Sequence, residues 1–214
     1  PPLTYDHTPA LYYHYVMCAD GIAISGHTRK NLNKKEDACF TSLDGRKALD
    51  CILSWQSEHG GWPKNKDTTS KAYSGKRSDL RTTFDNGATK GELRLLARGF
   101  RLTKQGRYEN GFLAGLHNVL KAQYPNGDSR NTIQHYSHIT FNDSCMVRIM
   151  ELLDEAGTSE DDAFLDDDPR AAVKKAFDLG LECILKCQIG VDDTLKVWCA
   201  QHDEVTLAPT KARS

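Results

Sequence analysis

Two aspartates and one arginine carry the clearest chemical signal in this 214-residue chain. Asp85 and Asp143 each stand at the start of a segment with helical spacing, and Asn86 and Asn142 lie beside them. Carboxylate and amide oxygens form a hard donor set that suits Ca²⁺ far better than Zn²⁺. Arg213, near the end of the sequence, adds a guanidinium group that is normally protonated. Taken singly, the aspartates would be helix N-caps and the arginine a solvated side chain, so a shared function requires that they converge in space.

Three further residues have types that are common in carbohydrate-binding sites. Trp62 follows a Gly-Gly pair and offers a ring that can stack on a sugar, although an indole there can equally pack the turn as a core residue. Lys64 lies two residues on and suits the carboxylate of an acidic sugar. His138 stands five residues before the second aspartate, where the alternative is a hydrogen bond within a loop. The predicted substrate-binding residues are Trp62, Lys64, Asn86, His138 and Asn142.

An internal repeat predicts how these residues are positioned. The segments "CILSWQ", "NVLKAQ" and "CILKCQ" end at Gln56, Gln123 and Gln188, with spacings of 67 and 65 residues. Each segment closes a helical pattern and precedes a turn, which is typical of a repeat architecture. Strand signals are weak apart from a short one at "KVW".

Each repeat should also hold a second helix. Two apolar stripes with the spacing i, i+3, i+4, i+7 indicate it. The stripes comprise Leu93, Leu96, Ala97 and Phe100 in one unit and Met146, Ile149, Met150 and Leu153 in the next. Asp85 and Asp143 stand at the expected N-caps of these helices, and Gly157 at a C-cap.

Closed into a ring, such helix pairs form an all-α (α/α)3 toroid with few short strands. The inner helices would begin at one mouth, and by register a third would start close to Arg213. The long loops 57–84, 124–141 and 189–212 would then wall a groove. We expect residues 1–45 to form an N-terminal extension and residues 46–214 to form the toroid.

Composition argues against several classes of function. The formal net charge is −1, which indicates no nucleic-acid-binding surface and no lipid-binding face. No stretch approaches about 18 consecutive apolar residues, so we expect no membrane span. The seven cysteines contain no CxxC pair, which disfavours a zinc knuckle. Cys51, Cys145 and Cys183 fall in apolar runs and are expected to act as small core residues.

Five segments, in order, resemble the pectate lyases of polysaccharide lyase family 10. They are "LSWQSEHGGWPKN", "TFDNGATKGELRLLAR", "LKAQYPNG", "HITFND" and "VWCAQHDEVTLAPTKAR". The similarity runs from about residue 47 to residue 213, and the last segment is the most specific. The family fold is an (α/α)3 toroid, which agrees with the architecture expected from the repeat.

The resemblance implies a mechanism and a location. In that family calcium bridges acidic side chains and the uronate, which assigns the metal to Asp85 and Asp143. An arginine removes the sugar's C5 proton in a β-elimination, and this role falls on Arg213. Since the free pKa of arginine exceeds about 12, activity should increase towards high pH. The implied partners are polygalacturonate or oligogalacturonides, without nucleic acid or membrane, and the implied protein is a secreted or periplasmic monomer.

The sequence departs from the family pattern at two places. "DSRN" follows "YPNG" where the family has Gly-Trp and Pro-Gln, and Ser144 follows "FND" in place of another acid, which leaves the number of metal ligands open. One alternative is a catalytically degenerate carbohydrate-binding toroid. Another is a triterpene-cyclase-like α/α barrel, whose Q-x-x-x-G-x-W turns resemble "QSEHGGW", although 8% aromatic residues are few for an aromatic-lined cavity.

Overall fold

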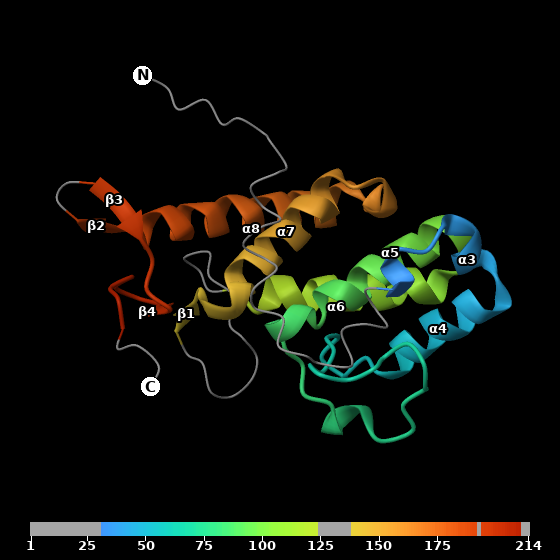
Figure 1. The fold of residues 1–214 in the computed structure, drawn as a ribbon. Helices are drawn as coiled ribbons and strands as arrows, with labels where there is room; N and C mark the ends of the chain where they lie inside the picture. Colours follow the sequence, from blue (N-terminus) through green and yellow to red (C-terminus); the bar gives the residue numbers. More distant parts are fainter. Residues whose placement is uncertain (1–30, 124–137, 192–193, 211–214) are drawn as a thin grey trace.

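The computed structural model describes residues 31–123, 138–191 and 194–210, and it is mostly helical, which confirms the all-α fold class (Figure 1). The α-helices are α3 (Asp37–Thr41), α4 (Leu43–Ser54), α5 (Lys90–Thr103), α6 (Gly106–Lys121), α7 (Cys145–Thr158) and α8 (Asp167–Lys186). Short 3-10 turns are η1 (Arg77–Asp79), η2 (Asp85–Gly87), η3 (Asn142–Ser144) and η4 (Glu160–Asp162). The strands are β1 (Ile139–Thr140), β2 (Ile189–Val191), β3 (Thr194–Val197) and β4 (Gln201–His202).

The helices pack in two layers that follow the predicted pairs. α4 contacts α6 and α6 contacts α8, so these three helices form one layer in sequence order. α5 and α7 contact each other in the second layer, and each packs closely against the helix that follows it, α6 or α8 (Figure 1). The alternation of outer and inner helices expected from the repeat is therefore present in the described part of the chain.

The repeated glutamines join successive outer helices. The side-chain amide of Gln56 donates to the carbonyl of Gly111 in α6, at 2.8 Å. The amide of Gln123 donates to the carbonyl of Ala176 in α8, also at 2.8 Å. Each acceptor lies twelve residues before the glutamine of the next unit, so the two contacts are equivalent. The repeated glutamine thus makes an equivalent hydrogen bond in both units, worth about 1 kcal/mol, that joins one unit to the next.

The apolar stripes predicted for the inner helices form the core. Seven of their eight residues are buried, and Phe100 is half-buried, with its ring 4.7 Å from that of Phe164. Fully burying one such aliphatic side chain contributes about 1.5–3 kcal/mol. The buried cluster runs without interruption from α4 to α8 and includes Trp62, Tyr108 and Phe112.

Ion pairs reinforce the contact between the two inner helices. Lys90 at the start of α5 pairs with Glu151 of α7, and Arg94 pairs with Glu155 one turn further along. Near the other end of α5, Arg101 pairs with Asp161 in η4 at 2.5 Å. These partners lie 60 or 61 residues apart in the sequence, so the pairs fix the register of α5 against the elements of the next unit.

The predicted helix caps were wrong in detail. α5 begins at Lys90 with Thr89 as its N-cap, because Asp85 starts the separate 3-10 turn η2. α7 begins at Cys145, after a matching turn. Gly157 lies inside α7, which ends one residue later with Ser159 as C-cap, so no left-handed glycine is needed there. The two turns give the aspartates a place outside the helices.

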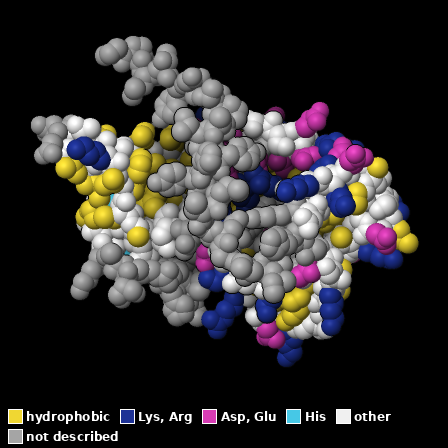
Figure 2. All heavy atoms as spheres, in the orientation of Figure 1, with side chains coloured by type: hydrophobic (Ala, Val, Ile, Leu, Met, Phe, Trp, Pro, Cys, Tyr) yellow, Lys and Arg dark blue, Asp and Glu magenta, His cyan; other side chains and the backbone are white. Residues whose placement is uncertain are grey.

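Two further expectations concern the boundary at residue 46 and the short strand at "KVW". α4 begins at Leu43, so this helix crosses the predicted boundary at residue 46, and α3 packs against both α4 and α5. β3 covers Lys196 and Val197, which confirms two residues of the "KVW" strand, and it pairs antiparallel with β2. Hydrophobic side chains gather on the surface at this hairpin and the end of α8 (Figure 2).

Six of the seven cysteines lie within the described ranges. Cys145 and Cys183 are buried as predicted, whereas Cys51 is half-buried. Burial raises the pKa of the Cys51 thiol, helped by the nearby Asp50. Over the same ranges, none of the helices is both long and apolar enough to cross a bilayer.

Candidate functional site

Two loops form the scaffold of the site, and the backbone of Trp62 joins them. Its N–H donates to Thr89 Oγ1 at 3.0 Å, and its carbonyl accepts from the N–H of Thr83 at 3.1 Å. The Thr89 hydroxyl in turn donates to the carbonyl of Thr83 at 2.9 Å. All three residues are buried, so these hydrogen bonds between the loop at Trp62 and the segment before α5 are shielded from solvent.

The side chain of Trp62 is part of the core, which corrects its predicted role in sugar stacking. It has no exposed surface, and its indole N–H donates to the carbonyl of Ile52 at 2.8 Å. A ring with both faces covered cannot stack on a sugar. The core role, which the sequence left open, is therefore the correct one.

The preceding glycines are required by this close packing. Gly60 has a φ of +94°, and a Cβ there would lie 2.2 Å from the carbonyl oxygen of Ala114. A Cβ on Gly61 would lie 2.1 Å from the methyl group of Thr82. The "GGW" segment thus anchors a loop, and its function in the site is to position Lys64.

Lys64 and Asp85 meet where the two loops come together. Lys64 Nζ donates to Asp85 Oδ2 at 2.5 Å, and the aspartate side chain is 15% exposed. The other carboxylate oxygen, Oδ1, has no hydrogen-bond partner among the described residues. Asn65 and Asn86 join the same loops a second time, through Asn86 Nδ2 donating to Asn65 Oδ1 at 3.1 Å. The turn therefore presents one carboxylate oxygen and one amide oxygen that remain available as ligands.

The turns that carry the two predicted metal ligands are equivalent in the repeat. Thr83-Phe84 precedes η2 and Thr140-Phe141 precedes η3, and the two phenylalanines have similar backbone angles, φ −101° and −95°. η2 packs against α7, and η3 leads directly into α7. Both turns therefore lie against the same helix.

Part of the predicted site lies outside what the structure describes. Arg213 falls in residues 211–214, and the side chain of Asp143 is likewise outside the description, although the backbone of its turn is not. Asn142 is half-buried, and its backbone N–H donates to the carbonyl of Ala200 at 3.4 Å. The meeting of Asp85, Asp143 and Arg213 around one ion thus stays a prediction.

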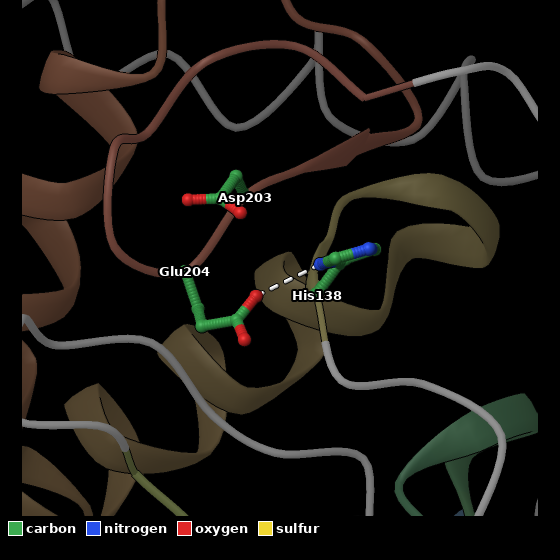
Figure 3. Close-up of side chains that lie close together, drawn as sticks. All are labelled: His138, Asp203 and Glu204. Atoms are coloured by element: carbon green, nitrogen blue, oxygen red, sulfur yellow. Dashed lines mark hydrogen bonds and ion pairs between the residues drawn. The ribbon is translucent and has the colours of Figure 1, made fainter.

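His138 lies in a different group of polar residues. Its Nδ1 is 2.8 Å from Glu204 Oε2, and Asp203 lies beside the pair (Figure 3). The hydrogen bond with His138 lowers the pKa of Glu204, and hydrogen bonds from Thr206 lower the pKa of Asp203. His138 therefore has a carboxylate partner within the protein, which is the loop hydrogen bond considered as its alternative role.

One cation of the site was missed by the sequence analysis. A Cβ on Gly87 would lie 3.5 Å from Arg148 Nη1, so the guanidinium of this α7 residue reaches the backbone of the Asp85 turn. Arg148 is half-buried and makes no ion pair within the described ranges. It is the fourth residue of α7 and lies between apolar residues of the stripe. Its place in the first turn of the predicted helix was the one signal in the sequence that could have indicated a position near the Asp85 turn.

The described chain is an α/α protein of helix pairs in two layers, with Asp85, Lys64 and Arg148 close to the start of the inner helix α5. The pectic acid lyase family model matches residues 56–214, and the chain therefore belongs to this family. This membership sets aside the triterpene-cyclase-like alternative. A search of curated protein sequences finds no match to the chain.

Solved structures agree with the family assignment. The chain is similar to a family 10 polysaccharide lyase from Cellvibrio cellulosa, with 30% identity, a TM-score of 0.70, and coverage of 87% of this chain and 57% of that chain. It is also similar to a mutant of a family 10 polysaccharide lyase from the same organism, in complex with trigalacturonic acid, with 28% identity and a TM-score of 0.71. That comparison covers 90% of this chain and 61% of the other, so the chain spans about three fifths of each structure's length.

Proposed function

We propose that this protein cleaves polygalacturonate or oligogalacturonides by calcium-assisted β-elimination. The observation that carries the proposal is the η2 turn, where Asp85 and Lys64 meet and Arg148 approaches from α7. A carboxylate flanked by two cations suits a polyanionic sugar together with a divalent ion. Membership of the pectic acid lyase family and similarity to a lyase in complex with trigalacturonic acid support the same substrate class.

The donor set of the turn fits Ca²⁺. Asp85 Oδ1 has no partner in the described part of the chain, and the amide oxygen of Asn86 remains available because its nitrogen makes the contact with Asn65. Together with Asp143 on the equivalent turn, these are hard oxygen ligands of the kind calcium prefers. When bound, the ion would withdraw charge from the uronate carboxylate and so stabilise the enolate-like intermediate.

The chain's own groups would bind the sugar and move the proton. Lys64, which pairs with Asp85, and Arg148, whose guanidinium lies near Gly87, would hold uronate carboxylates and so orient the ring over the turn. Arg213, in its neutral form, would take the C5 proton, which is weakly acidic because it lies next to the C6 carboxylate. The electrons of the C5–H bond form the C4–C5 double bond, the C4–O4 bond breaks, and O4 leaves with the next sugar and gains a proton. The product is a 4,5-unsaturated galacturonide.

The test is the ultraviolet absorbance of that unsaturated product. With polygalacturonate and Ca²⁺ we expect absorbance to rise with time, to rise faster at higher pH, and to stop when EGTA is added. Asp85→Asn should slow the reaction. The control is Asp50→Asn, at an exposed carboxylate of α4 that pairs with Arg107 of α6, and it should not slow the reaction. Arg213→Lys should abolish elimination. Undiminished product formation by this variant would exclude Arg213 as the base.

The same assay separates the lyase from a carbohydrate-binding toroid. If trigalacturonate binds in a calorimetric titration but no unsaturated product forms at any pH, the chain binds the sugar without cleaving it. Secretion and a monomeric state remain predictions. A sedimentation experiment would test the second of them.

A further inference from the structure

We infer that His138, Asp203 and Glu204 form a second cation site, distinct from the calcium site, which takes a first-row transition ion such as Zn²⁺ or Co²⁺. The three residues offer ligand atoms that lie within 4.8 Å of one another (Figure 3). This inference does not rest on the proposed lyase activity, because it concerns different ligands and a different class of metal.

The register of a short sheet brings the three residues together. β1 pairs antiparallel with β4, with Ile139 opposite His202. Continued by one residue, this register sets His138, which precedes β1, opposite Asp203, which follows β4. A further backbone hydrogen bond, from the N–H of Phe141 to the carbonyl of Ala200 at 2.9 Å, extends the pairing on the other side. The cluster is therefore placed by the backbone.

The loop after β4 holds the first carboxylate in a fixed position. Asp203 Oδ1 accepts hydrogen bonds from the N–H of Val205 at 3.0 Å and from the N–H of Thr206 at 2.7 Å. The Thr206 hydroxyl donates to the same oxygen at 2.8 Å. Asp203 Oδ2 has no hydrogen-bond partner in the described ranges, so it is the oxygen that can bind an ion.

The position of β4 itself is fixed by His202. This buried histidine accepts a hydrogen bond from the N–H of Cys199 through Nε2, at 3.1 Å. Its Nδ1 lies 2.9 Å from the carbonyl of Leu207 at the far end of the loop. Since both ring nitrogens are used, His202 is a structural residue, and the imidazole available to a ligand is that of His138.

The donor types decide which ion fits. One imidazole nitrogen with two carboxylate oxygens is a set that suits Zn²⁺ or Co²⁺, with water completing the coordination, whereas Ca²⁺ requires six or more oxygens. In a tetrahedral site with bonds of about 2.0 Å the ligand atoms stand about 3.3 Å apart. The 2.8 Å contact between His138 and Glu204 would therefore lengthen by about half an ångström. Side-chain rotation is sufficient for this, because both side chains are partly exposed, 38% and 26%.

Binding of Co²⁺ to the metal-free chain tests the site. We expect one ion to bind with a visible spectrum free of the intense thiolate charge-transfer bands that cysteine ligation would produce. His138→Gln and Glu204→Gln should each weaken binding at least about tenfold. His59→Gln is the matched control, because His59 is an exposed histidine 3.6 Å from a single carboxylate, Glu58, and this variant should bind as the parent does.

Two further measurements keep the result clear. Asp203→Asn retains an oxygen for the Thr206 hydrogen bonds and should therefore fold, which circular dichroism checks, while still weakening Co²⁺ binding. Excess Ca²⁺ should leave the Co²⁺ spectrum unchanged. The inference is overturned if Co²⁺ does not bind, if its spectrum shows thiolate ligation, or if binding is the same in the folded His138→Gln and Glu204→Gln variants. None of these outcomes bears on the polygalacturonate assay.

Discussion

Replacing Asp162 by asparagine should stabilise the protein at neutral and alkaline pH. Asp162 lies in η4, is 6% exposed, and its Oδ1 is buried without a hydrogen-bond partner among the described residues. Burial, followed by the nearby charges of Asp161 and Glu155, raises its pKa from 3.8 to about 7, although Arg94 and Arg170 act in the opposite direction. The folded protein therefore prefers the neutral acid at this position.

The sign of the effect follows from proton linkage. Below the unfolded pKa both states hold the proton, and the group does not affect stability. Between about pH 4 and pH 7 the unfolded chain loses the proton and the folded chain keeps it, so the free energy of unfolding falls as pH rises. A shift of about three units corresponds to about 4 kcal/mol. About 2.5 kcal/mol of this change falls between pH 5 and pH 8.

Urea denaturation of the parent and of Asp162→Asn at pH 5 and pH 8 measures this difference. The stability advantage of the variant should grow by about 2.5 kcal/mol over that interval, while titrations elsewhere cancel because both proteins share them. Asp154→Asn, at an exposed carboxylate on α7, is the control and should show no such growth. An advantage for Asp162→Asn that stays constant between the two pH values would refute the argument that burial keeps this acid neutral.

Three other substitutions test the scaffold and the site. Gly61→Ala should lower the free energy of unfolding by about 1–3 kcal/mol, because the added Cβ would overlap the methyl group of Thr82. Gly106→Ala is the control, since a Cβ there meets nothing within 4 Å and should not lower stability. Urea denaturation measures both variants. Gln56→Leu should cost about 1–3 kcal/mol in the same assay, since it removes two buried hydrogen bonds, one to Gly60 in the following turn and one to Gly111 in α6 of the next unit. Arg148→Gln should weaken calorimetric binding of trigalacturonate about 10–100-fold with the fold retained, whereas Arg107→Gln should not; equal affinities would exclude a contact with the uronate.

The sequence by itself determined the helices and their pairing, and it predicted the chemical class of one site. The repeat at Gln56, Gln123 and Gln188 predicted successive outer helices, and the structure confirms it with equivalent hydrogen bonds. The stripes of the inner helices were predictable because a 3.6-residue period reports which face of a helix is buried. The aspartates were recognisable because "TFDN" and "TFND" precede both inner helices.

Only the tertiary structure decided which side chains reach the site. Trp62 lies in the core while Lys64, two residues later, reaches Asp85 across 21 residues of sequence. His138 meets Glu204 across 66 residues, through a sheet of two short strands that the sequence barely signals. The physical reason is that a periodic pattern gives the direction of a side chain relative to its own helix. The partner of a loop residue depends instead on how separate elements pack, and the local sequence does not indicate which distant residues will lie close to it.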